Sequence, residues 1–174
     1  KHNLWFGSTD TLFCMDLKNH HRINYWKCPE NPGGNIIYCV YEDSKNNLWI
    51  GTSQGGLYLF DKENKQFISR YHHLRDSKSI SGDKVESIYE DHLGNLWIGT
   101  SNSGLNLFHF KDSTFTNFLL DKDRELSNRI RTIIEDKDGN LWFGTRDGLY
   151  LKDSLRNIFY HYAHIDHHFS VLNN

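Results

Sequence analysis

Residues 90–100 read Glu-Asp-His-Leu-Gly-Asn-Leu-Trp-Ile-Gly-Thr, and a phrase from the second half of this stretch occurs four times in the chain. The phrase is Leu-Trp, then Phe or Ile, then Gly. It begins at Leu4, Leu48, Leu96 and Leu141, with successive offsets of 44, 48 and 45 residues. A period of roughly 40–50 residues with strand-forming composition is typical of a propeller blade or of another repeated β unit. The recurrence therefore predicts a series of similar β-sheets.

The phrase lies inside a longer unit that predicts four strands. In the second unit, a β-branched and aromatic segment at 36–42 leads into an acidic turn at 42–47, whose Asn tolerates positive φ. The Leu-Trp phrase and a Gly-Leu phrase at 56–60 supply two further strands, and 66–71 supplies a more polar outer one. The later units repeat this plan, with first strands at 84–90 and 129–135 and fourth strands at 114–119 and 157–162.

The predicted fold is all-β, a β-propeller fragment of about 3.75 four-stranded blades. Summing the strands of the four units gives 15, since the first unit lacks its first strand. The chain divides into a partial blade at 1–35 and blades at 36–83, 84–128 and 129–174, all within one partial propeller domain. Because propellers close with about 4–8 blades, we expect this chain to adjoin the remaining blades of a longer propeller. Its two end sheets would expose apolar side chains, so self-association of the fragment is also expected.

Composition excludes several classes of function. The 174 residues have a formal net charge of −2, and Lys and Arg are scattered, so we expect no nucleic-acid partner. No apolar run approaches the roughly 20 residues that span a bilayer, and no membrane contact by this segment is expected. Aromatic residues make up 14% of the chain, with 13 Gly and only 2 Pro, which favours short strands joined by tight turns.

The repeated phrase resembles a known family. Residues 90–100, followed by Gly104–Phe108, are similar to the two-component regulator propeller repeat, and 135–145 is nearly as close, with Lys152 where an aromatic residue usually lies. The resemblance implies the periplasmic sensor region of a hybrid two-component system, as found in Bacteroidetes, with a histidine kinase beyond this chain. It also implies periplasmic localisation and an oligosaccharide as the partner that is recognised.

Two other classes of function remain open from the residues. One is a structural or dimerisation scaffold that binds no small ligand, and the other, less favoured, is a polysaccharide-active propeller enzyme. The acidic pairs that begin each turn could be read as catalytic carboxylates. They recur in every unit, however, as turn-capping residues do, so no catalytic residue is predicted. The tryptophans of the phrase recur in the same way and are predicted to pack between blades.

Histidine and cysteine provide no predicted metal or cofactor site. His161, His164, His167 and His168 are closely spaced, but they lie on the last outer strand and the loop after it, and surface histidines are the preferred interpretation. Cys14 and Cys39 occupy apolar or small positions of the repeat and are expected to be buried. Cys28, beside Pro29, is expected to be exposed. No cofactor is expected.

Ligand recognition is predicted where the repeats differ from one another. In a propeller, the start of the first strand and the loop between the second and third strands share one face near the central channel. Polar side chains there suit sugar hydroxyls, and Arg or Lys suits an acidic sugar. The candidate ligand-binding residues are Tyr38, Gln54, Lys84, Glu86, Asn102, Arg129, Arg131, Arg146 and Asp147.

Overall fold

The computed structural model describes residues 3–19, 23–30, 34–156, 158–163 and 170–172. Within them the chain forms sixteen strands in four antiparallel sheets, with one short 3-10 helix, η1 (Glu125–Asn128). The first sheet contains β1 (Asn3–Ser8), β2 (Thr11–Asp16) and β3 (Ile23–Lys27). The second contains β4 (Ile37–Glu42), β5 (Leu48–Thr52), β6 (Leu57–Asp61) and β7 (Gln66–Tyr71). The third contains β8 (Val85–Glu90), β9 (Leu96–Thr100), β10 (Leu105–His109) and β11 (Thr114–Phe118). The fourth contains β12 (Ile130–Glu135), β13 (Leu141–Thr145), β14 (Gly148–Lys152), β15 (Phe159–Tyr162) and β16 (Ser170–Leu172).

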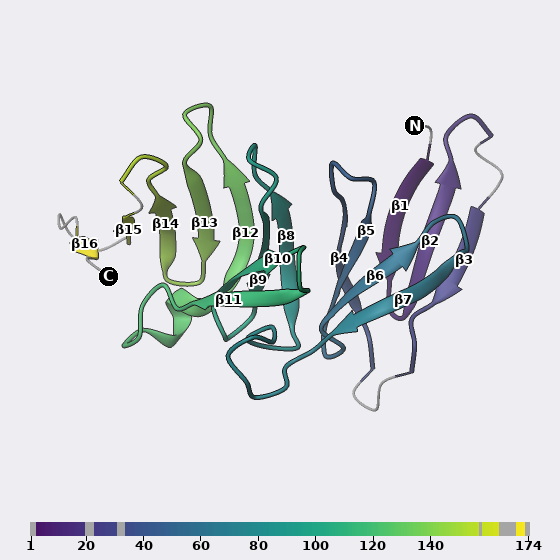
Figure 1. The fold of residues 1–174 in the computed structure, drawn as a ribbon, viewed down its shortest axis with the longest axis horizontal. Coiled ribbons are helices and arrows are strands. Elements are labelled where there is room, and N and C mark those ends of the chain that lie inside the picture. Colours follow the sequence, from purple (N-terminus) through teal and green to yellow (C-terminus); the bar gives the residue numbers. More distant parts are fainter. Residues whose placement is uncertain (1–2, 20–22, 31–33, 157, 164–169, 173–174) are drawn as a thin grey trace.

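The sheets are the blades of a propeller fragment. Figure 1 shows them following one another in chain order, with the first sheet at one end of the molecule and the last at the other. Neighbouring blades meet through their first strands, because β8 lies against both β4 and β12. The first strands are therefore innermost, and the predicted all-β propeller fragment with its fifteen strands is confirmed. The structure adds β16, a strand beyond the fifteen predicted ones, which pairs with β15. An outer strand offers unpaired backbone groups, and β16 uses those of β15.

An aspartate organises each acidic turn. In the third blade, the Asp91 carboxylate accepts hydrogen bonds from the backbone N–H of Leu93 (3.0 Å) and of Asn95 (2.9 Å), from Asn95 Nδ2 (2.9 Å) and from Trp97 Nε1 (2.9 Å). The turn then passes through a left-handed conformation at Gly94, where φ is 80°. The same bonds form around Asp43 and Asp136. The acidic pairs thus serve turn formation, as their recurrence predicted.

Those hydrogen bonds also favour the ionised carboxylate. The indole N–H of Trp142, and after it the amide of Asn140, lower the pKa of Asp136 to about 2. Because this pKa is depressed in the folded chain, the resulting stabilisation is present above the unfolded pKa of about 3.9. It is lost as the pH falls from there through about 2. At neutral pH the turn is therefore held by an anion.

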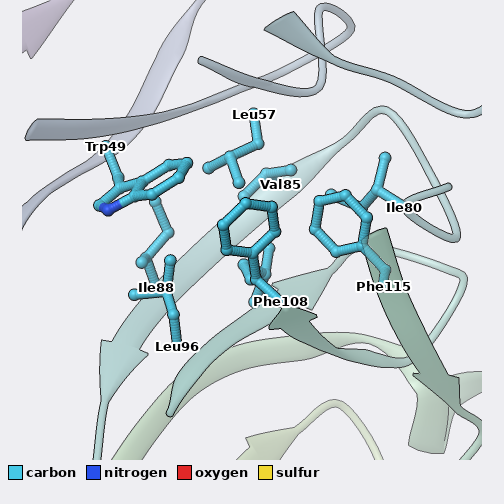
Figure 2. Close-up of a cluster of buried hydrophobic side chains, with 9 residues drawn as sticks. Trp49, Leu57, Ile80, Val85, Ile88, Leu96, Phe108 and Phe115 are labelled. Atoms are coloured by element: carbon cyan, nitrogen blue, oxygen red, sulfur yellow. The ribbon is translucent and has the colours of Figure 1, made fainter. Parts of the chain in front are cut away.

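The tryptophans of the repeat pack against the following blade. Trp49 is 1% exposed, and its ring meets Phe108 of the third sheet edge-to-face at 5.1 Å. Trp5 meets Phe60 of the second sheet in the same way, at 5.8 Å. Figure 2 shows Trp49 and Leu57 of the second sheet lying against side chains of the third, in one of three apolar clusters that join successive sheets. The predicted packing role of these tryptophans is confirmed for the blades that have a successor in the chain.

Lys152, which replaces the usual aromatic residue of the repeat, also contacts a tryptophan of the neighbouring blade. Lys152 stands where the other blades carry Phe60 and Phe108, and its Nζ lies 5.9 Å from the ring of Trp97 in the preceding blade. A cation above a tryptophan face is attracted by the electrons of the ring. The lysine therefore keeps contact with the tryptophan of the preceding blade after the aromatic partner is lost.

The glycine of the repeated phrase permits close approach of the next inner strand. A Cβ atom added to Gly99 would lie 2.3 Å from Ser87 Oγ and 2.7 Å from Ile130 Cβ in the fourth blade. A Cβ atom added to Gly51 would likewise lie 2.6 Å from Val85 Cγ1 in the third blade. A β-branched side chain thus fills the space above each of these glycines, and the repeat requires Gly for packing.

We predict that Gly99→Ala lowers the free energy of unfolding by about 1–3 kcal/mol, because the methyl group overpacks the junction with Ile130. Gly144→Ala is the matched control, since a Cβ atom there would press only on Thr132 of its own blade, an exposed side chain with room to move. Urea unfolding of both variants followed by circular dichroism measures the difference. Equal losses would show that inter-blade approach is not the reason for the glycine.

A glutamate ties each of the last two acidic turns to the blade before it. Glu90 accepts hydrogen bonds from the backbone N–H of Ser44 (2.6 Å) and from its hydroxyl (2.7 Å). Glu135 accepts one from the backbone N–H of His92 (2.8 Å) and also contacts His92 Nδ1. The bond to Glu135 raises the pKa of His92. Glu90 and Glu135 thus link blades, whereas Glu42 pairs with Lys62 of its own blade, and the second residue of each acidic pair forms the turn.

Candidate ligand-binding site

The inner strands bulge at the residues predicted to recognise a ligand. Pairing between β4 and β5 shifts register between Ile37 and Cys39, which leaves Tyr38 without a cross-strand partner. The same shift in β8 and β12 leaves Glu86 and Arg131 unpaired. A bulge turns the side chain of its extra residue and often lies beside a functional site. One backbone irregularity therefore presents three chemically different side chains at equivalent positions of three blades.

Three of the candidates come together across two blades. The ammonium group of Lys84 lies 5.5 Å from the ring centroid of Tyr38 and 3.5 Å from Glu86 Oε1. Lys84 and Tyr38 are both exposed, so the ion pair contributes little stability. The cluster instead offers an aromatic ring, a cation and an anion within a short distance of one another.

The loops between second and third strands lie at the same end of the blades. The backbone N–H of Ser53 donates to Ile36 O at 2.8 Å, and Ile36 N–H donates back to Ser53 Oγ at 3.1 Å. In the next blade, Ser101 N–H donates to Lys84 O at 2.9 Å. These bonds hold Gln54 and Asn102, both exposed, beside the starts of the inner strands. We call this face the inner-strand end; it comprises 36–38, 53–55, 84–86, 101–103, 129–131 and 146–147.

A positioning residue that the sequence analysis did not single out precedes each inner strand. Asn128 is buried, and its Oδ1 accepts the backbone N–H of Leu120 at 2.8 Å. Asp83 accepts the N–H of His73 through its side chain (2.6 Å) and that of Gly56 through its carbonyl (2.9 Å). Asn35 donates to Pro29 O (2.8 Å) and to the Tyr58 hydroxyl (3.1 Å). The signal was available, since all three blades carry Asn or Asp at this position.

The fourth blade differs from the others, because Asp147 is engaged both by the η1 segment that leads into the blade and by His161 of the blade itself. Its carboxylate accepts hydrogen bonds from Arg124 Nη1 (3.2 Å) and Ser127 Oγ (2.9 Å). Its carbonyl oxygen lies 2.7 Å from His161 Nε2, and Ser127 accepts the Tyr150 hydroxyl at 2.8 Å. Asp147 is therefore part of an internal polar network, whereas Arg131 and Arg146 are exposed.

The prediction that His161 is a surface residue is wrong. His161 is 6% exposed and stacks on Tyr150, with ring centroids 4.2 Å apart. His161 lies on β15, which is covered on its outer edge by β16. The His161 ring also contacts the carbonyl oxygen of Asp147. His164, His167 and His168 lie outside the described residues. Among the residues described, no three His, Cys, Asp or Glu side chains are grouped so as to hold a metal ion.

The prediction of an exposed Cys28 is also wrong. Cys28 is buried in the cluster that joins the first two sheets, where its N–H donates to Asp10 O at 2.7 Å and fixes the chain after β3. Burial raises the pKa of the Cys28 thiol, and that of Cys39, to about 12. Such thiols are protonated at neutral pH and unreactive. Cys14 is buried as predicted, whereas Cys39 is only partly covered.

Three hollows in the described part of the chain lie away from the candidate residues. One, of about 200 Å³, lies between β7 and the start of β11 and is floored by Tyr71 and Phe115. A second, of about 740 Å³, is lined by residues between Asp10 and Asn35, and a third, of about 350 Å³, surrounds His92 and the third acidic turn. Six of the nine candidate residues are exposed, and Glu86, Arg129 and Asp147 are partly buried.

Repeated four-stranded blades with a variable inner-strand end define a β-propeller fragment. Residues 31–54, 79–102 and 124–147 match the family described as two component regulator propeller. The chain thus carries repeats of the two component regulator propeller family, which confirms the resemblance drawn from the sequence. No match was found among curated proteins.

Solved structures share the fold. The extracellular domain of the hybrid two component system BT3049 from B. thetaiotaomicron is 23% identical, with a TM-score of 0.77 over 94% of this chain and 23% of that one. The extracellular domain of BT4673 from the same organism, described both as a one component and as a hybrid two component system, is 23% identical, with a TM-score of 0.74 over 99% of this chain and 22% of that one. An inactive virginiamycin B lyase from Staphylococcus aureus is 14% identical, with a TM-score of 0.72 over 92% and 52%. The chain therefore spans about a quarter of the two extracellular domains.

In the described residues there is no helix with the length and apolar character needed to cross a membrane.

Proposed function

We propose that this chain is the ligand-sensing part of an extracellular or periplasmic propeller, which recognises an oligosaccharide and relays its binding to a kinase outside this chain. The observation that carries the proposal is the set of bulges at Tyr38, Glu86 and Arg131. The backbone there repeats from blade to blade while the side chain changes in kind. A site that recognises a ligand needs such differences, because a purely structural repeat would keep the residue constant.

The geometry supports a sensing mechanism based on differential affinity. Tyr38 belongs to the second blade and Lys84 and Glu86 to the third, so a ligand at this cluster contacts two blades at once. A ligand that binds one arrangement of the blades more tightly shifts the population toward that arrangement. The aromatic ring offers a stacking surface for a sugar, and the charged pair offers hydrogen bonds to its hydroxyl groups.

Calorimetric titration of the 174-residue chain with a panel of neutral and acidic oligosaccharides tests the proposal. We expect at least one member to bind, and Tyr38→Ala to weaken that binding about tenfold or more. Tyr25→Ala is the matched control, because Tyr25 is 68% exposed on the outer strand of the first blade. Equal affinities of the two variants, or no binding by any member of the panel, would contradict the proposal.

The second candidate function is a scaffold that associates through its end sheets. The first sheet exposes Leu4 (49%) and Ile23 (48%), and the last exposes Ile134 (55%) and Leu149 (38%). Such surfaces fit either further blades of a longer propeller or a second copy of the chain. Light scattering at micromolar concentration distinguishes the outcomes, since a monomeric mass would exclude self-association. An enzyme is disfavoured, because each aspartate of the acidic pairs is occupied in its turn.

A further inference from the structure

Three arginines of the fourth blade lie at the inner-strand end without partners. The side chains of Arg129, Arg131 and Arg146 form no hydrogen bond or ion pair with any other residue that the structure describes, and Arg129 Nε is buried without an acceptor. Arg70 and Arg124 are different, since the first donates to Gly55 O and the second pairs with Asp147. Arg75, in the loop after β7, also lacks a described partner, so three of the four unpartnered guanidinium groups in the described residues lie at the inner-strand end.

The backbone places the three side chains close together. Ile130 pairs with Thr145, so Arg129 and Arg146 are the next residues along at that end of β12 and β13. Arg131 follows Ile130 in β12 and is the bulged residue of that strand. At the equivalent positions of the third blade, Lys84 and Glu86 meet at 3.5 Å, which shows that the first and third residues of this segment point the same way.

Neighbouring acidic groups are already engaged. Glu86 pairs with Lys84, and Asp147 accepts hydrogen bonds from Arg124 and Ser127. The three arginines therefore bring three positive charges to this end of the fourth blade, and no described carboxylate is paired with any of them. Guanidinium groups bind carboxylate and sulfate oxygens through paired hydrogen bonds, and an oxyanion here would also satisfy Arg129 Nε.

We infer that Arg129, Arg131 and Arg146 form an oxyanion site, and that the ligand of the inner-strand end is an acidic oligosaccharide carrying carboxylate or sulfate groups. This inference rests on the proposed function and narrows its ligand class. The exposed ring of Tyr38 in the second blade then contacts a neutral part of the same ligand, and the arginines select its charge. A free inorganic anion is the other source of the same chemistry.

The test compares three titrants on the intact 174-residue chain: a panel of uronic and sulfated oligosaccharides, neutral oligosaccharides of matched length, and inorganic sulfate. We expect an acidic member to bind at least tenfold more tightly than its neutral counterpart, with an affinity that falls as salt is added. Arg131→Gln and Arg146→Gln should each weaken this binding about tenfold. Arg156→Gln removes the same charge from the exposed loop between β14 and β15 and should leave the affinity unchanged.

Each outcome decides between the ideas. Neutral and acidic members that bind equally, with no effect of either arginine variant, would overturn the oxyanion site while the proposed function stands. Sulfate that binds in an arginine-dependent manner, with no oligosaccharide bound, would support the oxyanion site and overturn the oligosaccharide as its source. No binding by any titrant would overturn both. Because Arg131 and Arg146 are exposed, their variants should unfold in urea as the parent chain does, and this comparison excludes a folding defect.

Discussion

Trp49→Ala should lower the free energy of unfolding by about 3–5 kcal/mol, which is the range for removing a large buried aromatic side chain. The ring of Trp49 is almost wholly buried and contacts Tyr71 of its own blade and Phe108 and Phe110 of the next. Its removal opens a cavity at the junction of two sheets and leaves Asp43 without the indole donor at 2.8 Å. Urea denaturation followed by far-ultraviolet circular dichroism measures the loss.

Trp142→Ala separates inter-blade packing from the turn. Trp142 donates to Asp136 at 2.8 Å, as Trp49 does to Asp43, so both variants lose the same hydrogen bond. Trp142 is only partly buried, however, and its ring contact is with Tyr162 of its own sheet. We expect Trp142→Ala to lower the free energy of unfolding by less than half as much as Trp49→Ala does. If the two variants are equally destabilised, the turn rather than the junction between blades determines the stability.

Recurrence in the sequence made the architecture predictable. A position that returns every 44–48 residues occupies the same place in each blade, so its chemistry reports a shared packing environment. This is why the Leu-Trp phrase located the strands and why the turn aspartates were not mistaken for catalysts. Trp26, outside the repeated phrase, packs on Trp5 of its own blade and on Phe60 of the next.

Features that depend on contact between blades could not be read from the repeat. Cys28 lies outside the repeated phrase, and its burial depends on residues of the next blade, such as Tyr58. The glutamate links have the same origin, because Glu135 of one turn meets His92, the residue after the aspartate of the turn before it. A pattern within one unit contains no information about which atom of the next unit it will meet.

The candidate site was located by the opposite signal, which is variation. Tyr38, Glu86 and Arg131 were chosen because they differ in kind at one repeated position, and the structure shows a bulge at each. The bulge itself has no marker in the sequence. Asp147 shows the limit of this reasoning, since it varies in the same way yet its carboxylate is engaged by Arg124 and Ser127 of the segment that leads into the fourth blade.

Asp91→Ala should lower the free energy of unfolding by about 3 kcal/mol or more, because hydrogen bonds to a charged group each contribute about 1.5–3 kcal/mol and are not additive. The buried carboxylate accepts four of them, one from the indole of Trp97. Asp91→Asn should also destabilise, since its amide nitrogen would face the donors of Asn95 and Trp97. Urea unfolding of the two variants measures both losses.

Asp61→Ala is the control that separates burial from the number of hydrogen bonds. Asp61 caps the exposed β6–β7 turn and accepts hydrogen bonds from Glu63 N–H, Asn64 N–H and Asn64 Nδ2. Water can replace the carboxylate there, so we expect a much smaller loss than at Asp91. A loss at Asp61 as large as that at Asp91 would contradict this account. In that case the number of hydrogen bonds within each turn would determine its contribution to the free energy of unfolding. The buried bond between the aspartate and the tryptophan that packs against the next blade would contribute no more than an exposed one.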